Sequence, residues 1–336
     1  MKFAGIIAEY DPFHNGHAWQ LAQAKALGAE RVAVAMSCSL VQRGALPLLP
    51  EAVRTRSALT CGADLVFALP APCACAGAEA FARAGVALLA AAGCDGLVFG
   101  AETPDAALLM EAAELLDSGS YRAALKAQLA GGARSFAAAR QAAAAQLASD
   151  ERVAALLDKP NNNLAVEYCR AIRSLAPRME AYPLPRQGAN HGEALHSAHG
   201  QFASASALRK LWAEGGADAV APYVPEAVFP LYQEAYAAGQ YTDFSAAGRC
   251  ELALLRSACR GKAPFADIRG VSEGLEHRLE AAVRTSTTYD ELLDALTTVR
   301  YPRARMRRLA MDAALGCTAD SLPALPPYLH LLGAQK

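Results

Sequence analysis

Residues 3–17 read FAGIIAEYDPFHNGH and decide the fold of this chain. The apolar run at 3–8 predicts a buried strand, and a short loop then leads to His14-Asn15-Gly16-His17 at a helix start. The first amides of a helix lack intrahelical acceptors and lie at the positive end of its dipole, so they favour an anion. We interpret the junction as a phosphate site in which Gly16 leaves room for the anion and both imidazoles donate to it. The alternative is that both histidines only cap the helix.

Composition sets the outer limits on fold and function. The chain has 336 residues, 53% of them hydrophobic, which is enough for a large core and predicts two domains. A net charge of −1 gives no general attraction to nucleic acid, so a polyanion would need a local basic patch. No leader and no uncharged apolar stretch of spanning length is visible. We therefore expect a cytoplasmic protein with neither a membrane nor DNA as partner.

The nine cysteines lack paired C-x-x-C spacings and mostly stand in apolar surroundings. This pattern is typical of reduced core thiols rather than a disulfide framework or a zinc site. Cys73-Ala74-Cys75 is the only close spacing, and His191, His196 and His199 follow one another irregularly in a polar stretch. Neither group has the spacing of a metal site, so we expect none.

Further apolar runs of strand length recur at 31–36, 64–69, 95–99 and 179–184, and a helical segment precedes each of the first three. Such alternation predicts an α/β fold with a parallel sheet, right-handed crossovers and a ligand beyond the carboxyl ends of the strands. From about Leu211 the sequence is helical, with no further strand signal. We therefore expect a Rossmann-like catalytic domain over 1–212 and a helical domain over 213–336.

Two polar segments stand at predicted helix starts. Lys159-Pro160-Asn161-Asn162-Asn163 could be a helix cap, but a cap uses one asparagine, so a ligand role for at least one of the three is an equal alternative. Residues 204–209, Ser-Ala-Ser-Ala-Leu-Arg, place hydroxyls, amides and a guanidinium within one helical turn. This arrangement favours a phosphate group over a simple cap.

Residues 300–308, RYPRARMRR, form the strongest basic cluster of the chain. Arginine suits bidentate phosphate contacts and tyrosine can stack on a base, so the segment predicts RNA binding. The alternative, equally compatible with the residues, is a solvated helix face that pairs with acidic neighbours. The predicted RNA-binding residues are Arg300, Arg303, Arg305, Arg307 and Arg308.

Taken together, these segments resemble the tRNA(Met) cytidine acetate ligase family, relatives of the class I nucleotidyltransferases. The matching segments cover most of the chain and are 5–17, 41–44 (Val-Gln-Arg-Gly), 62–66, 99–102, 159–162, Arg186, 204–206 with Arg209, and Arg300-Tyr301. The resemblance implies a nucleotidyltransferase domain that activates acetate with ATP to acetyl-adenylate. It also implies transfer of the acetyl group to N4 of the wobble cytidine of elongator tRNA(Met), forming N4-acetylcytidine. Mg²⁺ is expected with the ATP.

The resemblance also assigns roles to residues. His14 and His17 would stabilise the charge that develops on the phosphates, without a covalent bond. The ATP-binding set that it implies is Ile7, Ala8, Glu9, Tyr10, Asp11, Pro12, Phe13, Asn15, Gly16, Gln20, Gly100, Asn161, Arg186, Ser204, Ser206 and Arg209.

The chain departs from the family at a few positions. The family usually has asparagine at Asp11, a Ser-Gly-Asn run at residues 37–39, which include Cys38, and an Asp-Lys-Trp run at Pro50-Glu51-Ala52. Two alternatives stay open beside the ligase: a small-molecule adenylyltransferase, and a non-catalytic nucleotide- or RNA-binding protein, which Glu51 and Cys38 suggest.

Overall fold

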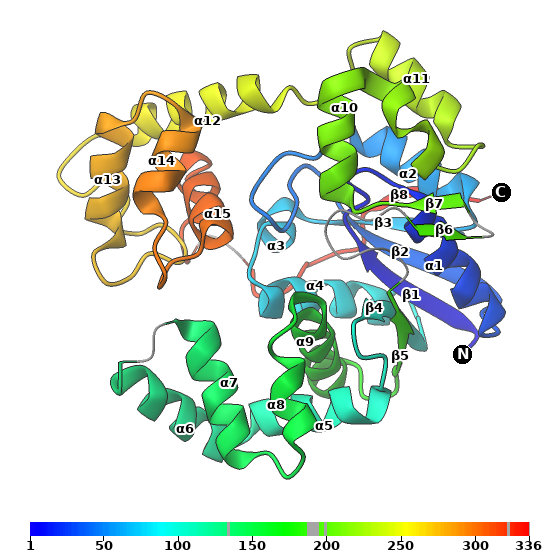
Figure 1. The fold of residues 1–336 in the computed structure, drawn as a ribbon, viewed down its shortest axis with the longest axis horizontal. Coiled ribbons are helices and arrows are strands. Elements are labelled where there is room, and N and C mark those ends of the chain that lie inside the picture. The colour runs from blue at the N-terminus through cyan, green and yellow to red at the C-terminus, as the bar shows by residue number, and fades with distance from the viewer. Residues whose placement is uncertain (133–134, 187–194, 198–199, 321–322, 336) are drawn as a thin grey trace.

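The computed structural model describes residues 1–132, 135–186, 195–197, 200–320 and 323–335. Its centre is a six-stranded sheet with the order β5-β4-β1-β2-β3-β8 (Figure 1). The strands are β1 (Phe3–Ala8), β2 (Arg31–Ser37), β3 (Leu65–Leu69), β4 (Gly96–Ala101), β5 (Glu180–Pro185) and β8 (Leu331–Ala334). Strands β1 to β5 run parallel, and β8 is antiparallel to β3. The parallel α/β sheet predicted from the sequence is confirmed.

The strands are apolar on both faces because helices cover both faces. In β2, Val32 and Val34 pack into the core on one side of the sheet, and Ala33 and Ala35 pack into the core on the other side. Strands buried on both faces read as continuous apolar runs rather than as alternating ones. This is why four short runs sufficed to predict β2, β3, β4 and β5.

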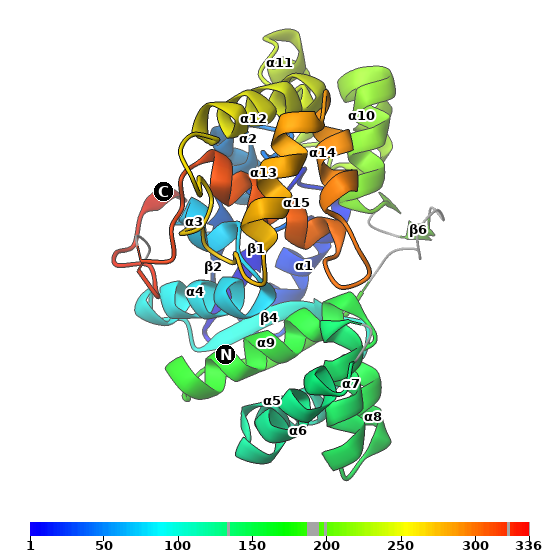
Figure 2. The same cartoon turned by 90° about the vertical axis from the view of Figure 1, so that its left-hand side faces the viewer.

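Helices α4 and α9 pack against each other on one face, whereas α1 lies on the opposite face. A group of four helices follows β4 and packs beneath α9 (Figure 2). The bounds of these elements are α1 (Asn15–Ala26), α2 (Glu51–Thr60), α3 (Ala71–Ala74), α4 (Ala78–Ala91), α5 (Ala106–Asp117), α6 (Gly119–Ala130), α7 (Phe136–Leu147), α8 (Glu151–Leu156) and α9 (Pro160–Leu175).

The segment after β5 returns to the face that carries α1. It contains β6 (Leu195–Ser197), β7 (Gly200–Phe202), α10 (Ala205–Val220), the 3-10 helix η1 (Ala221–Tyr223) and α11 (Phe229–Ala237). Trp212 of α10 and Tyr232 of α11 are buried in the same core as Phe13, and the Tyr232 hydroxyl donates to the Phe13 carbonyl at 2.7 Å. Helices α10 and α11 therefore hold the loop that follows β1.

The remaining helices are α12 (Phe244–Ala258), α13 (Leu275–Thr285), α14 (Tyr289–Leu296) and α15 (Arg303–Ala314). They enclose an apolar core of their own, which includes Leu255, Leu279, Leu292 and Met306, and they stand to one side of the sheet (Figure 1). None of the described helices is long and apolar enough to cross a membrane.

The expectation that no strand follows Leu211 is wrong, because β8 pairs with the edge of β3. Its four residues, LLGA, are too few for a periodic signal and include a glycine, which is rare in strands. The division of the chain at 212/213 stays a prediction. Helices α10 and α11 share the core of the sheet, whereas α12–α15 have a separate core.

Candidate active site

A cavity of about 370 Å³ lies at the carboxyl ends of β1, β4 and β5. Strand order reverses between β1 and β4, and in parallel sheets ligands bind beside such a switch point. The cavity wall comes from the loop after β1, the start of α1, the end of β4, the start of α9 and the residues before α10. The position agrees with the ligand edge predicted from the strand pattern.

Most of the predicted nucleotide-binding residues meet at this cavity. Those that line it are Ile7, Ala8, Glu9, Tyr10, Asp11, His14, Gly16, His17, Gln20, Gly100, Asn161, Arg186 and Ser204. Pro12, Phe13 and Asn15 do not line it. Phe13 is fully buried, and the side-chain amide of Asn15 donates to the carbonyls of Gln201 and Pro222, at 3.0 and 3.3 Å. Ser206 and Arg209 line a second cavity instead.

His14 and His17 cap α1 and also line the cavity. The Gly16 amide donates to Nδ1 of His14 at 3.0 Å, and the His14 amide donates to Nδ1 of His17 at 3.2 Å. An imidazole nitrogen that accepts a hydrogen bond carries no proton, so in each neutral ring the proton is on Nε2. Capping and ligand binding are therefore compatible, because capping uses one nitrogen of each ring and leaves the other as a donor.

Both rings are neutral at physiological pH. Burial lowers the pKa of His14 to about 3, and the positive charges of Arg186 and Arg209 add to this effect. Burial, the neighbouring His14 and Arg186 likewise lower the pKa of His17. A Cβ on Gly16 would lie 2.9 Å from Cε1 of His14, so this glycine makes room for the His14 ring, beyond the access for an anion expected from the sequence.

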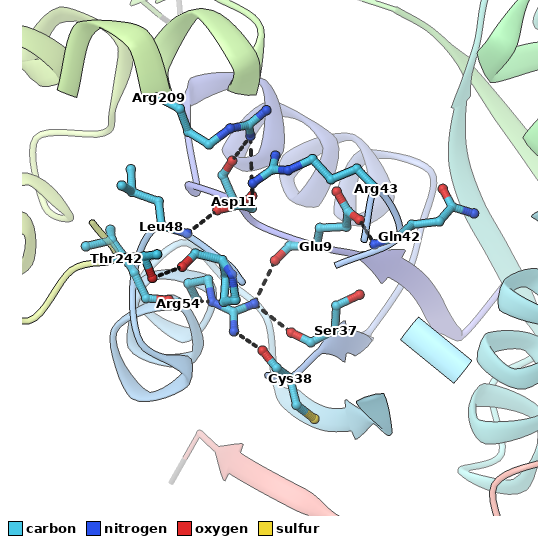
Figure 3. A network of polar contacts seen from close by, with 12 residues as sticks. Glu9, Asp11, Ser37, Cys38, Gln42, Arg43, Leu48, Arg54, Arg209 and Thr242 are labelled. Carbon is cyan, nitrogen blue, oxygen red and sulfur yellow. Dashed lines mark hydrogen bonds and ion pairs between the residues drawn. The ribbon is translucent and has the colours of Figure 1, made fainter. Parts of the chain in front are cut away.

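Asp11 joins this cavity to two arginines (Figure 3). Its buried carboxylate accepts from the Leu48 amide at 2.6 Å and forms ion pairs with Arg43 and with Arg209, the latter at 3.3 Å. Arg209 also donates to the Asp11 carbonyl at 2.6 Å. The carboxylate thus compensates two guanidinium groups.

Sequence reasoning missed Arg54, although it is fully buried behind the cavity. Its guanidinium donates to the carbonyls of Glu9 at 2.8 Å, Ser37 at 2.6 Å and Leu49 at 3.0 Å, and to that of Cys38 (Figure 3). These carbonyls lie directly after β1, at the end of β2 and just before α2, so one side chain holds three segments together. The available signal was a long charged residue among the small, uncharged residues of the inner face of α2.

The two glutamates near the β1 loop differ in their relation to the cavity. Glu9 lines the cavity and accepts from the Gln42 amide at 2.5 Å, and burial raises the pKa of its carboxyl group. Glu51 lies in the first turn of α2 and is not part of the cavity wall. A negative charge there complements the helix dipole. The acid at this position therefore does not face the predicted phosphate site.

Of the three asparagines, only Asn161 reaches the cavity. Glu102 accepts from the Asn161 side chain at 2.6 Å and from the Asn162 amide at 2.6 Å, and Arg186 donates to Asn161 at 2.5 Å. Asn162 is buried and accepts from the Thr103 amide at 2.9 Å. The segment therefore contains one candidate ligand residue and a structural anchor.

Two of the arginines predicted to bind RNA pair with acids. Arg300 contacts Glu273 at 2.7 Å, and Arg303 contacts Asp290 at 2.6 Å and also Asp294. These contacts match the alternative interpretation, a solvated face with acidic partners. Their guanidinium groups are less available to a phosphate than a free arginine would be.

The other three arginines form no ion pair among the described residues. Arg305 lies over the Tyr301 ring, 4.9 Å from its centroid. Arg308 donates to the Gln42 carbonyl at 3.2 Å, and Arg307 lines the second cavity. RNA binding by these side chains stays a prediction.

The described residues contain no group of three histidine, cysteine or acidic side chains that could hold a metal ion. His191 and His199 lie outside the described residues, and only the backbone of His196 is described. All nine cysteines lie in the described part of the chain and are free thiols.

Comparisons with known proteins agree with this geometry. The model of the HIGH Nucleotidyl Transferase family matches residues 1–336. A tRNA(Met) cytidine acetate ligase of Syntrophotalea carbinolica is 36% identical over 99% of this chain and 80% of the relative. That of Acetivibrio thermocellus is 33% identical over 99% of this chain and 83% of the relative.

A solved structure is similar along almost the whole chain. Thermotoga maritima TmcAL bound with alpha-thio ATP superposes with a TM-score of 0.88 at 28% identity, covering 99% of this chain and 80% of that one. Identity above 30% over nearly the whole of this chain and at least four fifths of each relative shows more than a shared fold. This chain therefore belongs to the HIGH nucleotidyl transferases and to their tRNA(Met) cytidine acetate ligase family.

Proposed function

We propose that this protein activates acetate with ATP and transfers the acetyl group to N4 of the wobble cytidine of elongator tRNA(Met). The observation that carries the proposal is the pair of neutral imidazoles at the switch-point cavity, beside Arg186, whose Nε2–H groups form no hydrogen bond among the described residues and can therefore donate to a ligand. Relatives that share a third of the sequence are named for this reaction, and a similar structure was solved with alpha-thio ATP.

The reaction has two steps. A carboxylate oxygen of acetate attacks the α-phosphorus of ATP, which breaks the bond to pyrophosphate and gives acetyl-adenylate. The N4 amine then attacks the acetyl carbonyl carbon, AMP leaves with the bonding electron pair, and the amine loses one proton. In the first step, charge moves onto the phosphate oxygens and the leaving pyrophosphate, where His14 and His17 would donate. Fixed donors of this kind stabilise such charge without reorganising.

The cavity-lining residues have complementary roles in this proposal. The two neutral histidines supply hydrogen bonds, while Arg186 supplies the positive charge that the triphosphate needs. Asn161 would orient Arg186, because its Oδ1 accepts from that guanidinium. ATP would carry Mg²⁺ on its phosphates, as in other phosphoryl chemistry. Arg305, Arg307 and Arg308 would contact the tRNA backbone in a cytoplasmic reaction.

The test is to incubate the purified protein with ATP, Mg²⁺, acetate and elongator tRNA(Met), and to analyse the nucleosides by mass spectrometry. N4-acetylcytidine that depends on both ATP and acetate is expected, together with acetate-dependent exchange of pyrophosphate into ATP. A small-molecule adenylyltransferase would leave the tRNA unmodified and would exchange pyrophosphate with a different co-substrate. A non-catalytic binding protein would do neither.

A further inference from the structure

A second cavity, of about 790 Å³, lies beside the first one. Its wall comes from the loop over residues 43–46, from α10, from α12, from the start of α14 and from α15. It therefore lies between the body that contains the sheet and the helical group α12–α15, and the roles proposed above for the first cavity leave it unused. Arg43 and Arg209 line this cavity, and both contact Asp11, which lines the first cavity. One layer of side chains thus separates the two cavities.

The second cavity is positively charged. Besides Arg43 and Arg209, which Asp11 compensates, Lys210, Arg249 and Arg307 line it. None of these three forms an ion pair among the described residues, and Arg249 donates to a serine hydroxyl at 2.8 Å. A phosphodiester backbone supplies the anions that such an arrangement lacks.

A buried carboxylate, Glu251, belongs to the wall of this cavity and lies next to the hydroxyl of Tyr289. Glu251 of α12 is 9% exposed, and its Oε2 has no hydrogen-bond partner in the described part of the chain. Burial raises the pKa of Glu251 and the buried hydroxyl of Tyr289, the neighbouring donor, lowers it, but the two groups do not meet in good hydrogen-bond geometry. Buried polar atoms in folded proteins are normally hydrogen-bonded, and an unsatisfied one costs about 1–3 kcal/mol. An incoming donor would give Oε2 the well-aligned hydrogen bond that Tyr289 does not supply in this geometry.

The wall also offers an aromatic face. Phe244 at the start of α12 is 39% exposed, and the guanidinium of Arg43 lies 5.9 Å from the centroid of its ring. Unstacked bases of single-stranded RNA are typically held between aromatic rings and arginine planes. A carboxylate in such a pocket selects a base that presents an exocyclic amine, and among pyrimidines this is cytosine.

We propose that the second cavity receives the acceptor cytidine, taken out of its stack, with Oε2 of Glu251 accepting a hydrogen bond from the exocyclic amine. This inference rests on the function proposed above. Phe244 would stack on the base, and Lys210, Arg249 and Arg307 would hold the neighbouring phosphates. The amine carries two hydrogens, so one bond to Glu251 leaves its nitrogen free to react once the side chains of Arg43 and Arg209 move aside and the acetyl-adenylate of the first cavity meets it. The two substrates of the transfer thus occupy adjoining cavities.

The experiment compares two RNA stem–loops that differ only in the acceptor base, C or U, in binding to the full chain without ATP. Uracil presents an oxygen where cytosine presents the amine, so Glu251 should discriminate against it. We expect the wild type to bind the C form about tenfold more tightly or better. Glu251→Leu should abolish the preference for the C form. Glu251→Gln should reduce the ratio of the two affinities, because an amide can turn its NH₂ group toward the O4 atom of uracil.

Glu234→Gln is the matched control, because Glu234 is an exposed residue of α11 that lines neither cavity. It should keep the C-over-U ratio of the wild type. Thermal denaturation shows whether each Glu251 variant is folded. If Glu251→Leu is unfolded, the conservative variant Glu251→Gln still decides the test. A wild type without a preference, or folded Glu251 variants that keep the full preference, would overturn the inference.

The result of this binding experiment can be distinguished from the result of the acetylation test of the proposed function. If Glu251 carries the C-over-U preference but the wild type never acetylates tRNA, the proposed function fails and the base pocket stands. If the wild type acetylates tRNA but folded Glu251 variants discriminate unchanged, the base pocket fails and the proposed function stands.

Discussion

The rings of His14 and His17 stack with their centroids 3.8 Å apart, and each accepts a backbone N–H through Nδ1. Two like imidazoles can lie this close because neither is charged. The arrangement fixes two stacked donor rings at the start of α1 before any ligand arrives. Such preorganisation is what charge stabilisation in a transition state requires.

We expect His14→Ala and His17→Ala each to slow acetate-dependent pyrophosphate exchange by about 10²–10³-fold, because one transition-state donor is lost. His14→Asn is the matched variant, since asparagine is a good N-cap but presents no donor at the reach of Nε2. It should regain stability relative to His14→Ala without regaining rate. A loss below about tenfold in the alanine variants would exclude the donor role.

The lowered pKa of His14 predicts a pH dependence of stability. Between about pH 3 and the ordinary value of 6.5, the unfolded chain binds a proton at this residue and the native state does not. The free energy of unfolding should therefore fall as the pH drops through this window, by up to about 1.4 kcal/mol per pH unit for this group. In His14→Asn the slope measured by urea unfolding should be smaller by that amount. An unchanged slope would mean that the ring is protonated in the native state.

Replacing Arg54 by Met should destabilise the protein by about 3–5 kcal/mol, because four carbonyl groups lose their buried donor. Arg56→Met, at an exposed position of the same helix, should cost less than about 0.5 kcal/mol. Urea unfolding of both variants gives the comparison. Equal effects would show that Arg54 does not hold the three segments together.

Asp11→Asn keeps an oxygen for the Leu48 amide but removes the charge that compensates Arg43 and Arg209. The positive potential beside the first cavity rises, so ATP should bind several-fold more tightly. Isothermal titration calorimetry with ATP measures this change. Asp218→Asn, on α10 and away from both cavities, should leave ATP affinity unchanged. Weaker ATP binding in Asp11→Asn would contradict the prediction.

The five arginines of the basic segment should divide into two classes. Arg305, Arg307 and Arg308 lack acidic partners among the described residues, so replacing all three by alanine should lower the salt slope of tRNA binding by about 2–3. Replacing Arg300 and Arg303, which already pair with acids, should change it by less than 1. Filter binding at several salt concentrations measures both slopes. Equal slopes for the two sets would refute the division.

The sequence predicted those parts of the fold and of the site that lie within one short segment. Strand β1, its loop and the start of α1 are contiguous. One run of residues therefore predicted both the strand whose carboxyl end borders the first cavity and the two histidines. What it could not predict depends on contacts between separate helices, strands and loops. The acids that pair with Arg303 come from α14, and the carbonyls around Arg54 come from the residue after β1, from the end of β2 and from the loop just before α2. The second cavity lies between two separately packed units, so no single segment carries its pattern.

Strand β8 has a consequence for how the helical group can move. The chain leaves the sheet body after α11, builds α12–α15, and comes back to pair with β3. The helical group α12–α15 is therefore attached to the sheet body at both of its ends, so it cannot move away from that body on a single linker. Rocking about these two attachment points is the motion left to it, and such rocking would open or narrow the space between the two units without separating them.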